Sequence, residues 1–344
     1  MNILYSIQAT GNGHISRAME LLPHLKKYGT IDIFLSGANS SLPLNAPIKY
    51  RSKGLSLFYT CNGTLDYWKL AKSISPLRVM KEVRDLPVEK YDLIINDFEC
   101  ITSLACARKK IPSVNFGHQA SFQSVKTPRP DKKNKAGEWI LKNYARANQY
   151  IGLHFEPYDD FIVNPVIKKE ILEAEAVNNG HITVYLPSYC DGQLRKFLSP
   201  LKDFQFHVFS HTAKSKTSHE NINFIPVNKD EFNRSLISCL GIITGGGFET
   251  PAEALYLGKK MIAIPIKGQY EQECNAAALR RLGVKTFDKL DDDFTDTFNN
   301  WINDSSTTKV SYKYSTKEIV EFLMYNSTNL KYRKEEFYPE MIFN

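Results

Sequence analysis

Short apolar, β-branched runs alternate with segments of helical periodicity along almost the whole chain. This alternation is typical of parallel sheets built from β-α-β units. In the first half we predict strands at residues 3–8, 31–35, 55–59, 93–96, 113–116 and 150–154. In the second half we predict strands at residues 182–186, 204–209, 222–227, 241–244 and 261–264. The pattern predicts an α/β fold with two tandem Rossmann-like, doubly wound domains.

The segments between the strands set the expected domain limits. The first helix carries apolar residues at helical spacing, Ile15, Ala18, Met19, Leu22 and Leu25, and we expect Gly29 to end it. The polar stretch 156–179 is expected to be a partly helical linker. We therefore place the first domain at residues 1–160 and the second at 161–314. An amphipathic helix at about 315–330 is expected to pack back on the first domain.

Length and composition agree with two well-packed domains, since the chain has 344 residues and 42% hydrophobic content. No apolar run approaches the ~18 residues of a membrane span, and the N-terminus does not look like a signal peptide. We therefore expect a cytoplasmic protein. The six cysteines form no CxxC pair and show no metal-like spacing with histidine, so we predict six reduced thiols.

The net charge of +7 is modest but partly concentrated. Seven cations fall in one stretch with two acids: Lys126, Arg129, Lys132, Lys133, Lys135, Lys142 and Arg146. Such a stretch is either a solvated face or a peripheral contact with an anionic membrane or acceptor, for example at the inner membrane face. We expect no nucleic-acid partner.

A first glycine loop, Gly11-Asn12-Gly13-His14, follows the first strand and precedes a helix. Glycines let the backbone approach a ligand, and a helix N-terminus favours an anion. The dinucleotide fingerprint needs a third glycine where Ser16 stands, so that motif is absent. A plain tight turn is the alternative reading. His14 adds a titratable group in the crevice where doubly wound folds bind ligands.

A second glycine loop, Gly245-Gly246-Gly247-Phe248, again follows a strand and opens a helix. Three glycines remove every Cβ where a diphosphate would lie, and the helix dipole would face it. The local alternative is a capping box, with Thr250 as the N-cap and Glu253 three residues later. Capping, however, does not require three glycines. One strand later, the amides and carboxylates of residues 267–275 are suited to hydrogen-bonding sugar hydroxyls.

Residues 223–282 resemble the donor half of GT-B nucleotide-sugar glycosyltransferases, specifically the MurG-like branch of peptidoglycan synthesis and related bacterial enzymes. The resemblance implies an acceptor-side first domain, a donor-binding second domain and an active site in the interdomain cleft. It implies a UDP-sugar donor, with base contacts near residues 225–228, and hexosyl or N-acetylhexosaminyl transfer.

Matched motif by motif, the resemblance assigns roles to individual residues. In the family a glycine loop holds the diphosphate, a glutamate holds the ribose and a glutamine-rich loop holds the sugar. The implied donor-binding residues are Gly11, Gly13, Gly245, Gly246, Gly247, Phe248, Thr250, Glu253, Glu271, Gln272 and Asn275. A segment similar to the family's histidine-glutamine motif places His118 and Gln119 on the acceptor side.

The sequence departs from the family at residues 96–100, where the peptidoglycan enzyme has another glycine-rich loop that serves its lipid-linked substrate. The acceptor, a sugar or a lipid-linked molecule, therefore stays open. Asp97 and Glu99 supply carboxylates here, and Asp97 is equally suited to cap a helix. Our first candidate for the general base is His14, followed by Glu99, Asp97 and His118. A structural histidine in the turn is the alternative for His14.

Two further features bear on the mechanism. Retaining GT-B relatives carry a glutamate eight residues before the ribose ligand, where this chain has Gly245, so we predict an inverting reaction. The run Asp291-Asp292-Asp293 contains a DxD pattern but follows no strand, so we expect no metal and no cofactor. Two other functions remain open: a UDP-sugar epimerase, which needs no acceptor, and a non-catalytic nucleotide-sugar-binding module.

Overall fold

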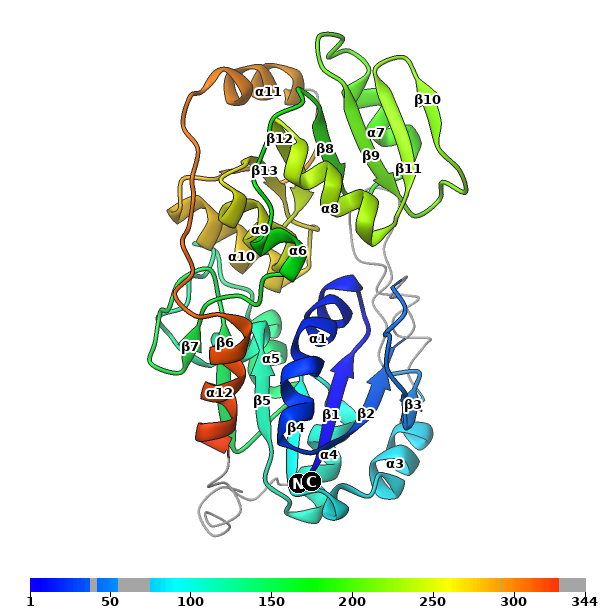
Figure 1. Cartoon of the computed structure of the whole chain (residues 1–344), viewed down its shortest axis with the longest axis vertical. Coiled ribbons are helices and arrows are strands. Elements are labelled where there is room, and N and C mark those ends of the chain that lie inside the picture. The colour runs from blue at the N-terminus through cyan, green and yellow to red at the C-terminus, as the bar shows by residue number, and fades with distance from the viewer. Residues whose placement is uncertain (38–41, 55–74, 292, 328–344) are drawn as a thin grey trace.

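The computed structural model describes residues 1–37, 42–54, 75–291 and 293–327. Within them the chain forms two seven-stranded sheets, one built from each half of the sequence. Figure 1 shows the sheets one above the other along the long axis of the molecule, flanked by helices. The prediction of two Rossmann-like α/β domains is confirmed.

The first sheet has the strand order β3-β2-β1-β4-β5-β6-β7, and all its neighbours are parallel. Its strands are β1 (Asn2–Gln8), β2 (Thr30–Ser36), β3 (Tyr50–Ser52), β4 (Leu93–Asp97), β5 (Val114–Gly117), β6 (Gln149–Leu153) and β7 (Ile162–Val163). Its helical segments are α1 (Asn12–Leu25), η1 (Lys26–Tyr28), α3 (Pro76–Asp85), η2 (Val88–Lys90), α4 (Cys100–Lys109), η3 (His118–Gln123) and α5 (Lys135–Asn143). The order reverses between β1 and β4, which makes their carboxyl ends a switch point for ligands.

The second sheet has the order β10-β11-β9-β8-β12-β13-β14, in which only β10 pairs antiparallel. Its strands are β8 (Ile182–Tyr185), β9 (Phe206–Ser210), β10 (Thr217–His219), β11 (Ile222–Pro226), β12 (Gly241–Gly245), β13 (Lys260–Ile264) and β14 (Lys285–Thr286). The helices are α6 (Lys169–Leu172), α7 (Asp191–Leu198), α8 (Lys229–Ser238), α9 (Glu249–Leu257), α10 (Tyr270–Arg281), α11 (Phe294–Asn303) and α12 (Thr316–Ser327). Here the switch point lies between β8 and β12.

Ten of the eleven predicted strands are found, because the central strands of parallel sheets are buried on both faces and appear as continuous apolar runs. The eleventh, at 55–59, lies outside the described residues. Four strands were not predicted: β3, β7, β10 and β14, each two or three residues long. All three residues of the edge strand β10 are exposed and polar, so burial leaves no pattern there.

Helix α12 lies against α1, and its buried residues Ile319, Val320 and Leu323 join the core of the first sheet. The linker region contains α6 and also β7. Cys100, Cys106, Cys239 and Cys274 are buried free thiols, whereas Cys190 is disulfide-bonded, so the prediction of six reduced cysteines is wrong for Cys190. The sixth, Cys61, lies outside the described residues. A disulfide requires only that two Cα atoms come within about 7 Å in space, which sequence spacing does not reveal.

Candidate active site

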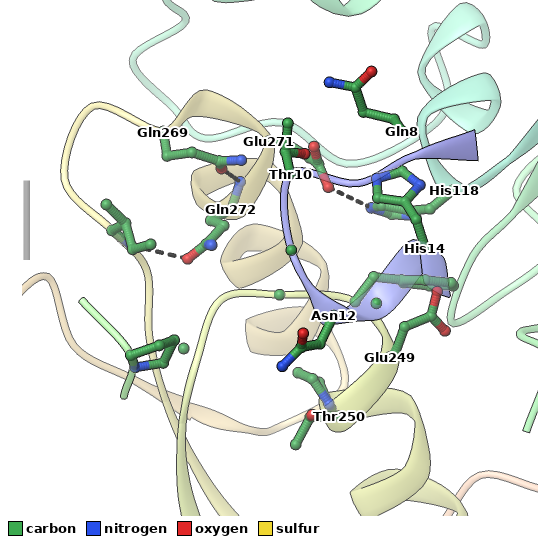
Figure 2. A pocket seen from close by; sticks show the side chains of 18 of the residues that line it. Gln8, Thr10, Asn12, His14, His118, Glu249, Thr250, Gln269, Glu271 and Gln272 are labelled. Carbon is green, nitrogen blue, oxygen red and sulfur yellow. Dashed lines mark hydrogen bonds and ion pairs between the residues drawn. The ribbon is translucent and has the colours of Figure 1, made fainter. Parts of the chain in front are cut away.

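A cavity of about 1030 Å³ lies where the carboxyl ends of the two sheets meet. Figure 2 shows the first loop, with Thr10, Asn12 and His14, beside the residue 269–272 segment of the second half. The predicted site residues that line it are Gly11, Gly13, His14, His118, Gln119, Gly245, Gly247, Phe248, Thr250, Glu271 and Gln272. The other predicted site residues, Asp97, Glu99, Gly246, Glu253 and Asn275, lie behind this lining. Val227 and Asn228, near the expected base contacts, also line the cavity.

His14 and Asp97 form a hydrogen-bonded pair on the side of the cavity that belongs to the first sheet. The distance from His14 Nδ1 to Asp97 Oδ1 is 2.9 Å, and the Asp97 carboxylate is completely buried at the end of β4. A carboxylate only accepts hydrogen bonds, so the contact with Asp97 requires a proton on Nδ1, whereas Arg17 Nη2, a donor 3.0 Å from the same Nδ1, competes for that position. With the proton on Nδ1, Nε2 carries the lone pair that a general base requires.

Arg17, to which the sequence analysis gave no role, lies one helical turn after His14 on α1. Its Nη2 donates to both Asp97 oxygens, at 2.7 and 2.8 Å, and its Nη1 pairs with Glu249. Burial opposes ionisation of Asp97, but Arg17 and His14 outweigh it and hold the pKa of Asp97 below its usual range. The i, i+3 spacing of His14 and Arg17 was the only signal in the sequence that could have suggested the cluster.

Glu99 does not face the cavity. Its carboxylate caps α4 by accepting from the backbone N–H groups of Ile101 and Thr102, at 2.9 and 2.6 Å. Burial raises the pKa of Glu99 although these N–H groups oppose the shift. The suggested capping role of Asp97 is therefore wrong, since the cap is Glu99. Asp97 instead supports His14.

The second glycine loop divides its residues between the cavity and the protein interior. A Cβ on Gly246 would lie 2.8 Å from the Gln272 carbonyl oxygen, whereas one on Gly247 would meet nothing within 4 Å. Helix α9 begins at Glu249, with Phe248 as the N-cap and no side-chain cap. The capping box suggested for Thr250 and Glu253 is therefore wrong. This helix end lies at the cavity and is suited to an anion.

Glu253 is buried and accepts a hydrogen bond from Lys168 Nζ at 3.0 Å. The same Nζ donates to Asn233 Oδ1 at 3.1 Å. Burial raises the pKa of Glu253, and Lys168 opposes that shift. Lys168 itself lines the cavity. The pair thus connects the buried carboxylate to the wall of the cavity through a cation.

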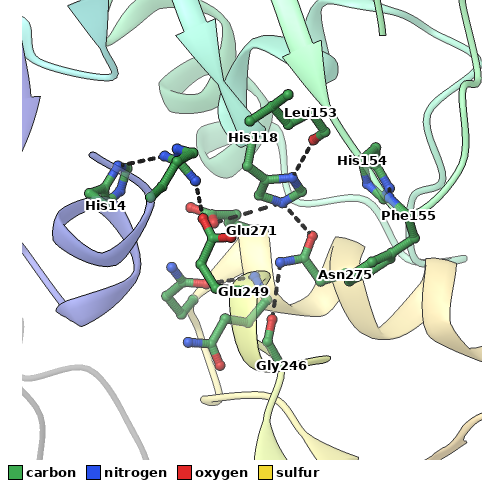
Figure 3. Close-up of polar contacts among 12 residues, drawn as sticks. His14, His118, Leu153, His154, Phe155, Gly246, Glu249, Glu271 and Asn275 are labelled. Carbon is green, nitrogen blue, oxygen red and sulfur yellow. Dashed lines mark hydrogen bonds and ion pairs between the residues drawn. The ribbon is translucent and has the colours of Figure 1, made fainter. Parts of the chain in front are cut away.

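His118 joins the two halves of the molecule (Figure 3). Its ring stacks on Phe248 with centroids 3.9 Å apart, and its Nε2 lies 2.8 Å from Asn275 Oδ1. Its Nδ1 lies 2.9 Å from the Leu153 carbonyl, and burial lowers its pKa. Asn275 Nδ2 donates to the Gly246 carbonyl at 3.1 Å. In the structure, Asn275 therefore links His118 to the glycine loop.

The residue 266–272 loop is held by its own glutamines. Gln269 caps α10 by accepting from the Gln272 N–H at 2.6 Å, and Gln272 accepts from the Ile266 N–H at 3.0 Å. Glu271 lines the cavity, with Oε1 3.9 Å from His118 Nε2. The side-chain NH₂ group of Gln272 and the carboxylate of Glu271 are thus placed to hydrogen-bond a polar ligand at the cavity wall.

The described part of the chain holds no group of three or more His, Cys, Asp or Glu side chains arranged to bind a metal ion. Asp292, the middle residue of the DxD pattern, lies outside that part. In the same described ranges, no helix is both long and apolar enough to cross a membrane.

Comparison with known proteins identifies the fold. The family model described as glycosyl transferase family 1 matches residues 1–302. A comparison with curated protein sequences finds no match. Among solved structures, Arabidopsis thaliana UGT89C1 complexed with UDP is 12% identical at a TM-score of 0.57, with 95% of this chain and 94% of that chain covered. The same protein is also known complexed with UDP-L-rhamnose.

Two further structures show the same likeness. LpCGTa in complex with UDP is 14% identical at a TM-score of 0.57, with 95% of this chain and 94% of that chain covered. The spinosyn forosaminyltransferase SpnP is 13% identical at a TM-score of 0.52, with 95% of this chain and 99% of that chain covered. Because the sequence identities are this low, these structural likenesses establish the GT-B fold alone.

Proposed function

Because the chain belongs to glycosyl transferase family 1 and is a glycosyltransferase, we propose that it moves a sugar from a UDP-sugar to an acceptor hydroxyl with inversion at the anomeric carbon. The observation that carries the proposal is the cavity itself. On one side it has the His14–Asp97 pair, and on the other it has the open Gly247 and the N-terminus of α9. A base and an anion site thus share one cavity, as a single displacement requires.

In the proposed reaction, His14 Nε2 removes the acceptor's hydroxyl proton as the oxygen attacks the anomeric carbon. The bond from that carbon to the diphosphate oxygen breaks, and its electron pair leaves with UDP. Asp97 stabilises the imidazolium that forms and holds the ring in the required tautomer. The backbone N–H groups around Gly245 and Gly247 and the dipole of α9 meet the charge that develops on the leaving group. No metal ion is needed in this scheme.

The donor assignment is supported by the residues around the cavity. Val227 and Asn228 line it next to β11, where the base is expected, and Glu271 and Gln272 line it where the sugar is expected. Structures of similar fold are complexed with UDP or UDP-L-rhamnose. The order of the motifs also supports a place near the MurG-like branch. Glu253 reaches the ribose in this scheme only if donor binding rearranges its pairing with Lys168.

On the acceptor side we propose peripheral contact with an anionic membrane. Trp139 on α5 is 66% exposed and Val125 is 87% exposed, and the exposed Lys132, Lys133 and Lys135 adjoin them in sequence. Exposed aromatic and aliphatic side chains among cations are suited to an anionic lipid surface. Arg129 does not contribute, since it is paired with Glu138 and donates to the Phe122 carbonyl at 2.9 Å. Ile140 of the same helix lines the cavity, so an acceptor could enter beside the membrane.

The test of the function is transfer itself. The protein is incubated with UDP-hexoses or UDP-N-acetylhexosamines and an acceptor panel that includes lipid-linked sugars, with and without EDTA. We expect UDP release that depends on the acceptor and survives EDTA, and a β-linked product from an α-linked donor by proton NMR. Turnover that is abolished by EDTA and rescued by manganese would refute the metal-free mechanism, and an α-linked product would refute the single displacement. Sedimentation with phosphatidylglycerol vesicles, compared with Trp139→Ala, tests the membrane contact.

A further inference from the structure

Glu249 is the first residue of α9 and stands two residues after Gly247, the open glycine of the second loop. It lines the cavity, yet its side chain is only 12% exposed. A carboxylate at this place adds negative charge where the proposed reaction puts a diphosphate. Glu249 therefore has no role in the proposed reaction, although it lies beside the expected donor site.

The position of Glu249 is fixed from the opposite half of the molecule. Its carboxylate pairs with Arg17 of α1, and its Cγ lies 3.1 Å from the point where a Cβ on Gly13 would stand. The contact with Gly13 and the ion pair hold the side chain against the first loop, between the donor site and Asp97. Figure 3 shows Glu249 between the second glycine loop and the helix that carries His14.

The charged and titratable groups around Glu249 come from several elements. Arg17 and His14 face it from α1, Asp97 from β4 and Tyr5 from β1, and Glu253 lies one turn further along α9. The last neighbour is Tyr312, in the segment before α12. Burial raises the pKa of Glu249 to about 7, with Arg17 opposing the shift and Glu253 adding to it. A nearby diphosphate raises the pKa further, since like charges disfavour the ionised carboxyl.

We propose that Glu249 is a positioning residue that takes up a proton from solvent when a nucleoside-diphosphate sugar binds. When Glu249 is neutral, its carboxyl no longer repels the diphosphate. The positive charge of Arg17 then interacts with Asp97 and with the donor. Donor binding is thereby linked to the cluster that orients His14. The inference rests on the proposed function, because it requires the diphosphate to lie at the second glycine loop.

Proton uptake can be measured by calorimetric titration with UDP-glucose and UDP-N-acetylglucosamine in buffers of different ionisation enthalpy. These diesters lack the phosphate group of UDP that titrates near pH 6. At pH 7.5 we expect uptake of about half a proton or more per donor, because the carboxyl is largely ionised in the free protein. At pH 5.5 it is already protonated, and uptake should fall near zero. This comparison needs no variant.

Two variants assign the proton. Glu249→Gln should lose the uptake at pH 7.5, whereas His14→Gln, which removes a titratable side chain of the same cluster, should keep it. Donor binding at pH 7.5 without proton uptake, or uptake that persists in Glu249→Gln, would overturn the inference and leave the glycosyltransferase proposal intact. If neither nucleotide sugar bound, the proposed donor site would fail and the inference with it.

Discussion

The two sides of the cavity are built in different ways. Where we propose that the diphosphate binds, the ligand-facing groups are backbone atoms of one short segment, around Gly245 and Gly247 and the first turn of α9. On the proposed acceptor side, they are the side chains of His14 and Arg17 on α1, and the buried Asp97 of β4 supports both from behind the cavity lining. A diphosphate can be met by N–H groups of any sequence that folds correctly, whereas proton transfer needs one particular side chain.

The difference also shows in where the charges lie. The acceptor side concentrates a buried cation and a buried carboxylate in direct contact, and against the effect of burial Arg17 and His14 hold the pKa of Asp97 below its usual range. The donor side combines a helix terminus and uncharged glycines with Glu249, whose pKa burial raises to about 7. Substitutions on the acceptor side should therefore act mainly on turnover, and those on the donor side mainly on affinity or stability.

The largest effect is expected from His14→Ala. Loss of the general base should lower kcat by about 10³-fold, within the range of ~10² to 10⁴ for such groups, with little change in donor affinity. Steady-state kinetics and calorimetric titration with UDP measure the two quantities. The matched control is His219→Ala, on the exposed edge strand β10, which should behave as wild type. Unchanged turnover in His14→Ala would assign His14 a structural role.

The donor side can be tested with two adjacent glycines, neither of which has a positive φ. Gly246→Ala should lower stability by about 1–3 kcal/mol, because its Cβ would lie 2.8 Å from a backbone carbonyl oxygen. Gly247→Ala should fold normally but bind UDP at least about 10-fold more weakly, because its methyl group enters the cavity. Thermal melting and calorimetry separate the two outcomes. Full UDP affinity in Gly247→Ala would place the diphosphate elsewhere.

The fold and the position of the two glycine loops at the cavity were predictable because their signals are local. Buried parallel strands leave apolar runs, and a glycine-rich loop between a strand and a helix is visible in a few residues. The same reasoning identified His14 as a residue at the tip of the first strand. Predictions from local pattern failed for side chains whose interaction partners are distant in the sequence.

Glu253 illustrates this limit. Its spacing from Thr250 suggested a capping box, but α9 begins one residue before Thr250, and the carboxylate pairs with Lys168, which is 85 residues away. Glu99, predicted as a candidate base, is instead the N-cap because the helix begins at Cys100, and Asp97, predicted as a base or a cap, pairs with His14. Arg17 was missed because its two carboxylate partners, Asp97 and Glu249, lie in different halves of the chain.

Glu253→Gln tests whether the donor side also uses a buried charge. The amide can still accept from Lys168, but the buried cation loses its counter-charge, so we expect a loss of about 2 kcal/mol in the free energy of unfolding. The more exposed pair of Glu170 with Lys229 provides the control, and Glu170→Gln should cost less than about 1 kcal/mol. If Glu253 also holds the ribose, the variant should bind UDP at least about 10-fold more weakly, and 2'-deoxyuridine diphosphate should not show this difference.

The smallest effect is expected where the two sides touch, at the glycines of the first loop. Both Gly11 and Gly13 were predicted to bind the donor, but only Gly13 faces Glu249, while a Cβ on Gly11 would meet nothing within 4 Å. Gly13→Ala should shift the carboxylate by a few tenths of an ångström and lower kcat/KM about threefold, or about 0.7 kcal/mol. Stability should not fall, since Gly13 lies within α1 and alanine favours helix. If the first loop holds the diphosphate instead, Gly11→Ala will weaken UDP binding more than Gly13→Ala does. Calorimetry and steady-state kinetics on both variants would then show that the acceptor side, too, binds its ligand through the backbone, and the contrast between the two sides would no longer hold.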